Sequence, residues 1–90
     1  MPAHEVTIRN ELGLHARAAT RLVECANCFE CEIVLRSESR RVDGKSILAL
    51  LTLAAGPGME VTVETKGEDE DAALRALVEL IETGFGEPEL

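Results

Sequence analysis

Alternating apolar and polar positions predict four β-strands. In residues 5–9, Val6 and Ile8 face one way and the residues beside them face the other, which is the pattern of a half-buried strand. The strands that this alternation predicts are residues 5–9, 31–36, 40–42 and 60–66. Because each strand has one apolar face, we expect an antiparallel sheet with helices on one side and water on the other.

Between these strands the apolar positions change to a helical period. Ala19, Leu22, Val23 and Ala26 are spaced i, i+3, i+4 and i+7, so they form one apolar stripe. The helices predicted in this way are residues 16–27, 47–53 and 69–83, the last ended by Gly84, and residues 85–90 are expected to form a loose tail. The order is therefore β-α-β-β-α-β-α, an α+β fold in a single domain that spans residues 1–90.

The predicted helix at residues 47–53 has more apolar surface than a small two-layer domain can cover. One of its apolar faces consists of Ala49, Leu50 and Leu53. The other consists of Ile47, Leu48 and Leu51. We expect the core to cover one face and leave the other as an exposed apolar patch, which is typical of a protein–protein contact. The alternative is a short helix that is buried on all sides.

Composition and charge narrow the class of function. The chain has a formal net charge of −8, and aromatic residues make up only 2% of it. A nucleic-acid partner requires clustered Lys and Arg, and single strands also stack on aromatic rings. No apolar run is long enough to cross a membrane, and the odd number of cysteines, three, does not suit a secreted disulfide framework. We therefore expect a cytoplasmic protein that binds neither nucleic acid nor membrane.

The segment from Gly13 to Arg17 places an imidazole where a loop enters a helix. Backbone N–H groups at a helix N-terminus bind anions, and the Arg17 guanidinium can grip phosphate oxygens beside His15. A neutral imidazole is a competent nucleophile near pH 7. These groups together fit a site that accepts a phosphoryl group on nitrogen. The alternative is a histidine that only caps the helix.

Ser46 and the cysteines are the remaining candidates for chemistry. Ser46 directly precedes the helix at residues 47–53, where it can act as an N-cap or as a kinase target that adds charge beside the apolar patch. Cys25, Cys28 and Cys31 have a spacing that metal sites use, but such sites need four ligands and no suitable fourth ligand follows. We expect free thiols, no metal and no cofactor.

Two motifs together, Gly13-Leu14-His15-Ala16-Arg17 and Gly44-Lys45-Ser46-Ile47, resemble HPr, the histidine-containing phosphocarrier of the bacterial phosphoenolpyruvate-dependent sugar phosphotransferase system. The resemblance extends over residues 3–84. It implies an open-faced β-sandwich with strand order 1-4-2-3 and three helices on one face of the sheet.

The resemblance also implies a role for individual residues. Enzyme I would phosphorylate His15 on Nδ1, Arg17 would contact the phosphoryl group, and an EIIA component would receive it. Ser46 would be the regulatory site of HPr kinase/phosphorylase. The partner-binding residues would be Ala16, Thr20, Arg21, Ile47, Leu48 and Leu51. The protein would be a monomeric carrier rather than an enzyme in its own right.

Two positions depart from the family pattern. Ala18 stands where the family usually has proline, and Cys28 stands where it often has the glycine that closes the first helix. A cysteine there must either adopt a positive φ or end the helix in another way. Two rival functions stay open: a regulatory interaction module controlled by Ser46 without sugar transport, and a small metal-binding protein that uses its cysteines.

Overall fold

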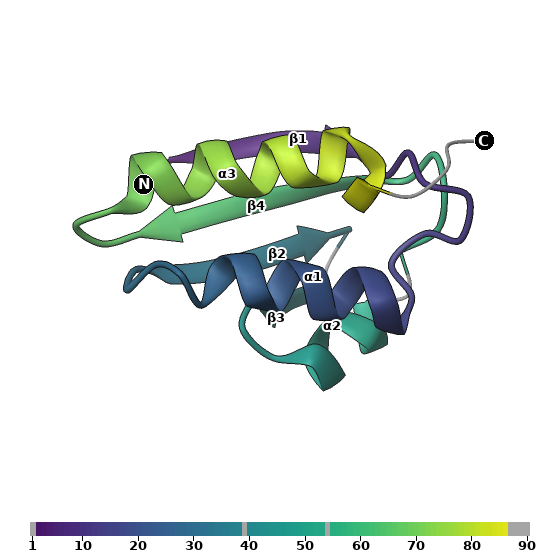
Figure 1. Ribbon diagram of the computed structural model, residues 1–90, viewed down its shortest axis with the longest axis horizontal. Helices are drawn as coiled ribbons and strands as arrows, with labels where there is room; N and C mark the ends of the chain where they lie inside the picture. The colour runs from purple at the N-terminus through teal and green to yellow at the C-terminus, as the bar shows by residue number, and fades with distance from the viewer. Residues whose placement is uncertain (1, 39, 54, 87–90) are drawn as a thin grey trace.

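The computed structural model describes residues 2–38, 40–53 and 55–86, and it contains the seven predicted elements in the predicted order (Figure 1). The strands are β1 (Ala3–Thr7), β2 (Glu32–Ser37), β3 (Arg40–Asp43) and β4 (Glu60–Lys66). The helices are α1 (Ala16–Ala26), α2 (Ile47–Leu53) and α3 (Glu70–Glu82), followed by a short 3-10 turn, η1 (Gly84–Gly86).

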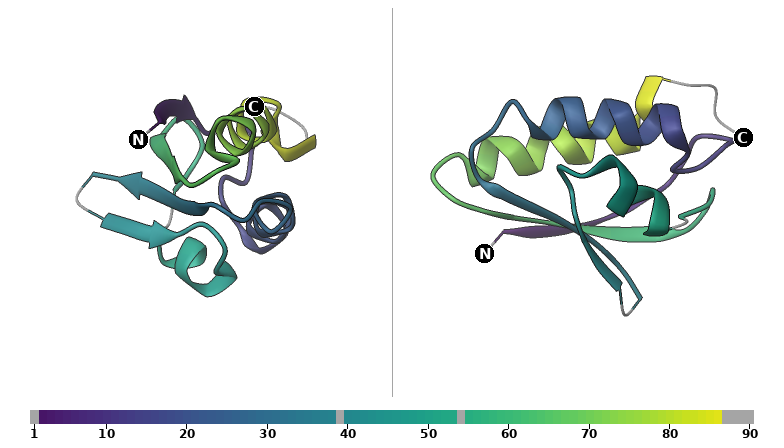
Figure 2. Two further views of the ribbon diagram at one scale, coloured as in Figure 1. Left: turned by 90° about the vertical axis from the view of Figure 1, so that its left-hand side faces the viewer. Right: turned by 90° about the horizontal axis from the view of Figure 1, so that it is seen from below.

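The four strands form one antiparallel sheet in the order β1-β4-β2-β3, which confirms the predicted strand order. In its register, Val6 pairs with Val61 and Leu35 pairs with Val63. These four side chains are buried under the three helices, which cover one face of the sheet (Figures 1 and 2). The fold is therefore the α+β open-faced sandwich that the sequence predicts.

The other face of the sheet is polar and carries a small cluster of charges. Glu64, on β4, is bound by Arg36 Nε at 3.2 Å and by Arg41 Nη2 at 2.9 Å. The two arginines belong to neighbouring strands, β2 and β3, so the cluster crosses three strands of the sheet. Exposed ion pairs of this kind contribute little to stability, but the cluster shows that this face is adapted to water.

The prediction of a loose tail from residue 85 onward is wrong for its first residues. Phe85 is only 1% exposed and is part of the core, and Gly86 belongs to η1. Phe85 adopts a positive φ of 58°, which turns the chain back over α1 and α3. The hydrophobic pattern of the sequence could not predict the burial of Phe85, because a single aromatic residue after the glycine that ends a helix forms no periodic pattern. Residues 87–90 of the predicted tail lie outside the described residues.

Helix α1 ends without the positive φ that a closing glycine would supply. Asn27 is its C-cap in a right-handed conformation, with φ −73° and ψ −8°. The Cys28 N–H then donates to Cys25 O at 3.1 Å, and the Phe29 N–H donates to Ala26 O at 3.1 Å. Both bonds have the i→i+3 spacing of a 3-10 turn. The helix therefore tightens at its end, and Cys28 does not need the positive φ that a glycine would adopt there.

Candidate functional site

His15 is the N-cap residue of α1. Its backbone is extended, with φ −92° and ψ −176°, and its carbonyl oxygen accepts the first helical hydrogen bond, from the Ala19 N–H at 2.8 Å. Its ring nitrogen Nδ1 accepts the backbone N–H of Arg17 at 3.3 Å. An Nδ1 that accepts a hydrogen bond carries a lone pair, so the neutral ring holds its proton on Nε2. The sequence therefore places an unprotonated ring nitrogen at the positive end of a helix.

The conformation of the loop before His15 depends on a glycine with positive φ and on hydrogen bonds from Asn10 and Leu14. Gly13 has a φ of +67°, and a Cβ at this position would lie 2.7 Å from Ala55 O. The buried Asn10 amide donates from Nδ2 to Gly13 O at 2.7 Å, and the Leu14 N–H donates to Ala55 O at 2.8 Å. Asn10 did not stand out in the sequence, although an Asn three residues before a glycine at a helix entry is typical of such a loop.

The residues that follow His15 divide between the surface and the core. Ala16, Arg17 and Thr20 are exposed on α1, and Thr20 Oγ1 donates to Ala16 O at 2.8 Å. Ala18, which replaces the usual proline, is fully buried and contributes to the core. The Arg17 guanidinium therefore lies at the surface on the same helical turn as His15, where it can approach an anion bound at Nδ1.

Arg21, which the resemblance assigns to partner binding, is half-buried and makes a hydrogen bond within the chain. Its Nη1 donates to the carbonyl oxygen of Phe85 in η1. The sequence contained no signal for this contact, because the two residues are far apart along the chain and Phe85 was expected in a tail. Part of the Arg21 side chain is thus used to hold the C-terminal turn against α1.

Ser46 caps the short helix α2. Its Oγ accepts the Ala49 N–H at 3.2 Å, and its carbonyl oxygen accepts the Leu50 N–H at 3.0 Å. Ser46 itself is half-buried, whereas the two residues after it, Ile47 and Leu48, are exposed. A modification of the Ser46 hydroxyl would therefore add charge directly beside apolar surface.

The two faces of α2 differ as predicted. On the predicted inner face, Leu50 and Leu53 are buried in the core, and Ala49 is half-buried and packs against it. The opposite face leaves Ile47, Leu48 and Leu51 exposed by 38%, 77% and 37%, respectively. We call these three residues the apolar patch. Its exposure confirms that the domain covers only one of the two apolar faces of α2.

Helix α2 packs against α1, so the apolar patch and His15 belong to adjacent helices (Figures 1 and 2). The loop before His15 adds one more exposed apolar side chain, Leu12, which is 69% exposed. The sequence analysis did not single out Leu12, although an apolar residue in a loop beside a candidate site is a usable signal. A partner that covers the patch on α2 would also be close to the start of α1.

Comparisons with known proteins bear on this arrangement. A family model described as "PTS HPr component phosphorylation site" matches residues 3–83. The chain belongs to the HPr family. It is 53% identical to the phosphocarrier protein HPr of Pseudomonas aeruginosa, over 99% of this chain and 100% of that protein. It is 45% identical to the phosphocarrier protein NPr of Shewanella violacea, over 92% and 91% of the two chains.

Solved structures agree with this assignment. The crystal structure of HPr-C-His from Thermoanaerobacter tengcongensis matches with a TM-score of 0.94 and 38% identity, over 98% of this chain and 99% of that chain. HPr from Bacillus anthracis matches with a TM-score of 0.86 and 34% identity, over 89% and 95%. Membership of the HPr family makes this chain a phosphocarrier of the phosphotransferase system.

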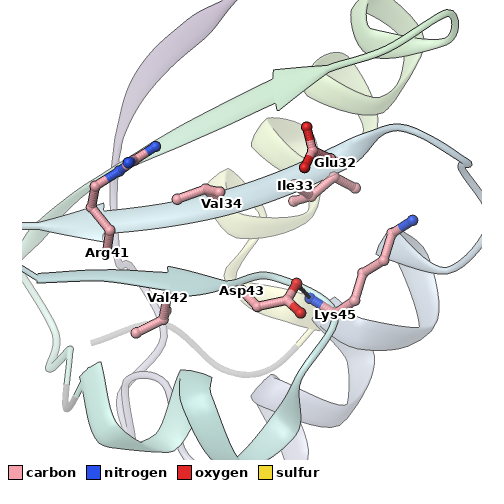
Figure 3. A pocket seen from close by; sticks show the side chains of 7 residues that line it. All are labelled: Glu32, Ile33, Val34, Arg41, Val42, Asp43 and Lys45. Atoms are coloured by element: carbon pink, nitrogen blue, oxygen red, sulfur yellow. Dashed lines mark hydrogen bonds between the residues drawn. The ribbon is translucent and has the colours of Figure 1, made fainter.

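A hollow of about 500 Å³ lies elsewhere on the molecule, lined by residues of β2, β3 and the start of the following turn (Figure 3). None of the sequence-predicted site residues lines it. Its two cations are already bound within the chain: Arg41 pairs with Glu64, and Lys45 Nζ donates to Phe29 O at 2.7 Å. This hollow is therefore no part of a phosphoryl site in an HPr-family protein.

The three cysteines lie outside the site at His15. Cys28 is exposed, Cys25 is half-buried and Cys31 is buried, and all three are free thiols. The described part of the chain holds no cluster of three or more His, Cys, Asp or Glu side chains placed to bind a metal. Within the same residues, no helix has the length and apolar character needed to cross a membrane.

Proposed function

We propose that this chain accepts a phosphoryl group from phospho-Enzyme I on Nδ1 of His15 and passes it to EIIA components in the cytoplasm. One observation carries the proposal: Nδ1 already accepts the Arg17 N–H at the start of α1, at 3.3 Å. The nitrogen is therefore unprotonated, with a lone pair that accepts this N–H before transfer, and it lies at a place where the backbone favours negative charge.

The hydrogen bond to Nδ1 is also suited to the product of the transfer. When the lone pair of Nδ1 forms the bond to phosphorus, the Arg17 N–H loses its present acceptor. The phosphoryl oxygens then lie next to this N–H and can accept its hydrogen bond in place of Nδ1. The same donor thus serves the nucleophile before transfer and the phosphoryl group afterwards, with no movement of the helix.

Arg17 supplies the second part of the charge neutralisation. Its exposed guanidinium lies two residues after His15, on the first turn of α1. A guanidinium can donate two parallel hydrogen bonds to phosphoryl oxygens and so spread the charge during transfer. Because the site is half-exposed and not a closed cavity, Enzyme I and an EIIA component can reach it in turn.

Labelling with Enzyme I and radioactive phosphoenolpyruvate tests the proposal, and the chain offers a matched control. His4 is the second histidine, exposed on β1. His15→Ala is expected to abolish an acid-labile label, whereas His4→Ala retains it. Phosphorus NMR of the labelled protein should show the N–P bond on Nδ1. Equal labelling of His15→Ala and the unaltered chain would overturn the proposal.

A second role follows from Ser46, and we propose that an HPr kinase/phosphorylase phosphorylates it to regulate docking. The support is the position of Ser46 at the start of α2, next to Ile47 and Leu48 of the apolar patch. Ser46→Asp is expected to slow labelling of His15 by Enzyme I, because a negative charge beside the patch opposes docking. Ser46→Ala is the control and should label at the original rate.

The regulatory role alone is the rival to the carrier role. A chain that served only as a regulatory module would take label from ATP and the kinase at Ser46, and would not pass label from His15 to an EIIA component. The two are separated by mixing the His15-labelled protein with EIIA: transfer of the label supports the carrier role, and retention of it on His15 contradicts that role.

A further inference from the structure

Strand β1 lies at the edge of the sheet, where β4 is its one strand neighbour among the described residues (Figure 1). At one end of this pairing the Thr65 N–H donates to Pro2 O at 3.1 Å. At the other end the Ile8 N–H donates to Met59 O at 2.9 Å. Antiparallel strands exchange such bonds at every second residue, so the even-numbered residues of β1 bond to β4. The residues whose N–H and C=O groups point outward instead are Ala3, Glu5 and Thr7.

A groove of about 380 Å³ lies beside this edge, between β1 and α3. Its floor is apolar, because the α3 side chains of Leu74 and Val78 line it and are only half-buried against the core. Its rim is acidic, and the exposed carboxylates that line it are Asp71, Glu79 and Glu82. His4 lines the groove from β1, so the even-numbered side chains of this strand face α3.

The charges of this surface indicate a basic occupant. The groove sets three carboxylates against one guanidinium, that of Arg75. Glu5 adds a further exposed carboxylate on the edge strand itself. Lys and Arg side chains suit such a groove, because their apolar stems can cover Leu74 and Val78 while their charged ends reach the carboxylates.

The spacing of the carboxylates suits an extended segment. The helical rise places Asp71 and Glu82 about 16 Å apart along α3, which lies along β1 (Figures 1 and 2). In a strand, alternate side chains point the same way and are about 6.8 Å apart, so four of them span about 20 Å. Basic residues at alternate positions of a strand beside β1 would therefore extend over the whole acidic rim.

A second copy of this chain is the alternative occupant, and charge opposes it. If the β1 strands of two copies paired antiparallel about a two-fold axis at Glu5, the two Glu5 carboxylates would lie directly opposite each other. The same axis would place the two acidic rims on α3 on one side of the joined sheet. Like charges at opposite positions destabilise a strand pair, so this edge favours a partner of the other sign.

We propose that an extended segment of a partner protein, with Lys or Arg at alternate positions, adds to β1 as a further strand and directs its basic side chains into the groove on α3. Its backbone pairs with the outward groups of β1, and its side chains supply the positive charge that the groove lacks. The groove is lined by neither His15 nor Ser46 nor the apolar patch. It is therefore a second interaction surface, separate from the site of phosphoryl transfer.

A synthetic peptide tests the proposal on the full-length protein. The probe is an acetylated and amidated heptapeptide with Lys at positions 1, 3, 5 and 7 and Thr between them. Backbone hydrogen exchange is followed by NMR with and without a saturating amount of peptide. We expect exchange to slow about tenfold or more at the outward N–H groups of Ala3, Glu5 and Thr7, and to change little at His4 and Val6, which already bond to β4.

A second peptide separates strand addition from attraction between opposite charges. It has the same sequence and charge, but N-methyl groups on its internal backbone nitrogens prevent it from pairing with β1. We expect it to bind about tenfold more weakly or less tightly still. Equal binding of the two peptides would overturn the proposal, because it would show only that a polycation is attracted to an acidic protein.

Two variants locate the bound peptide. Glu79→Gln removes an exposed charge from the rim of the groove and should weaken binding about threefold. Glu24→Gln removes the same charge from the surface of α1 and should leave the affinity unchanged. The proposal is wrong if the two variants weaken binding equally, if the slowed N–H groups lie outside β1, or if sedimentation shows that the protein without peptide already forms a dimer through this edge.

Discussion

Arg21 Nη1 donates a hydrogen bond to the carbonyl oxygen of Phe85, a residue that lies 64 positions later in the chain. The bond joins α1, whose N-cap is His15, to η1 at the C-terminal end of the described chain. It accompanies the burial of the Phe85 ring, so the C-terminal turn is part of the fold. The same turn packs against Asn10, since a Cβ at Gly84 would lie 3.6 Å from the Asn10 Cβ. The loop that positions His15 is thus supported from the far end of the chain.

Phe85→Ala is expected to lower the free energy of unfolding by about 3 kcal/mol or more, because it leaves a cavity where a fully buried ring was packed. Urea denaturation followed by circular dichroism measures the change. Leu12→Ala is the control: Leu12 is 69% exposed, and its loss should change stability by less than about 0.5 kcal/mol. An equal effect of the two substitutions would show that Phe85 is not part of the core.

Gly13→Ala should both destabilise the protein and slow phosphorylation of His15. Alanine at a φ of +67° costs about 1–2 kcal/mol for the backbone alone, and its Cβ would press on Ala55 O. Relief of that contact moves the loop that ends at His15, so labelling by Enzyme I should slow as well. Gly56→Ala is the matched control, since a Cβ there meets nothing within 4 Å. Unchanged labelling of Gly13→Ala would mean that the loop does not position His15.

The helices and strands of this fold could be predicted from the sequence because the apolar positions in each repeat with the period of a helix or of a strand. The stripe from Ala19 to Ala26 and the alternation in residues 60–66 each fix an element and its buried face. Apolar surplus on α2 predicted an exposed patch for the same reason, since counting the apolar faces of a helix needs no knowledge of its neighbours. Strand order is different: it depends on long-range pairing and came only from the resemblance to the HPr family.

The missed features all depend on contacts between segments far apart in the sequence. Phe85 has no periodic partner, so nothing local indicated that its ring is buried. The Asp69 carboxylate, at the start of α3, accepts the backbone N–H groups of Glu30 at 2.9 Å and Cys31 at 3.0 Å, and no local pattern indicates these partners. For His15, by contrast, the local motif was enough to predict the position at a helix start, because a cap is a relationship between neighbouring residues.

Asp69 should make the stability of the protein depend on pH in the acidic range. The N–H of Glu30 is the main cause that lowers the pKa of the Asp69 carboxyl in the folded state. Because its folded pKa is below the unfolded one, its contribution is fully present above the ordinary value of 3.8 and is lost as the pH falls below it. Asp69→Asn should flatten this acid dependence in urea denaturation at a series of pH values. Asp71→Asn, which changes an exposed carboxyl on α3, should retain it, and an unaltered acid slope in Asp69→Asn would refute the assignment.

Leu48→Ser separates docking from folding. Leu48 is 77% exposed and is the most exposed residue of the apolar patch, so the substitution should leave the free energy of unfolding within about 0.5 kcal/mol of the original. If Enzyme I covers the patch, the lost apolar contact should raise the KM for phosphorylation about fivefold or more, with little change in kcat, because binding and not chemistry is affected. Steady-state labelling at varied protein concentration measures both constants. Val34→Thr, on the opposite face of the sheet, should leave them unchanged; a KM unaltered by Leu48→Ser would show that Enzyme I docks elsewhere.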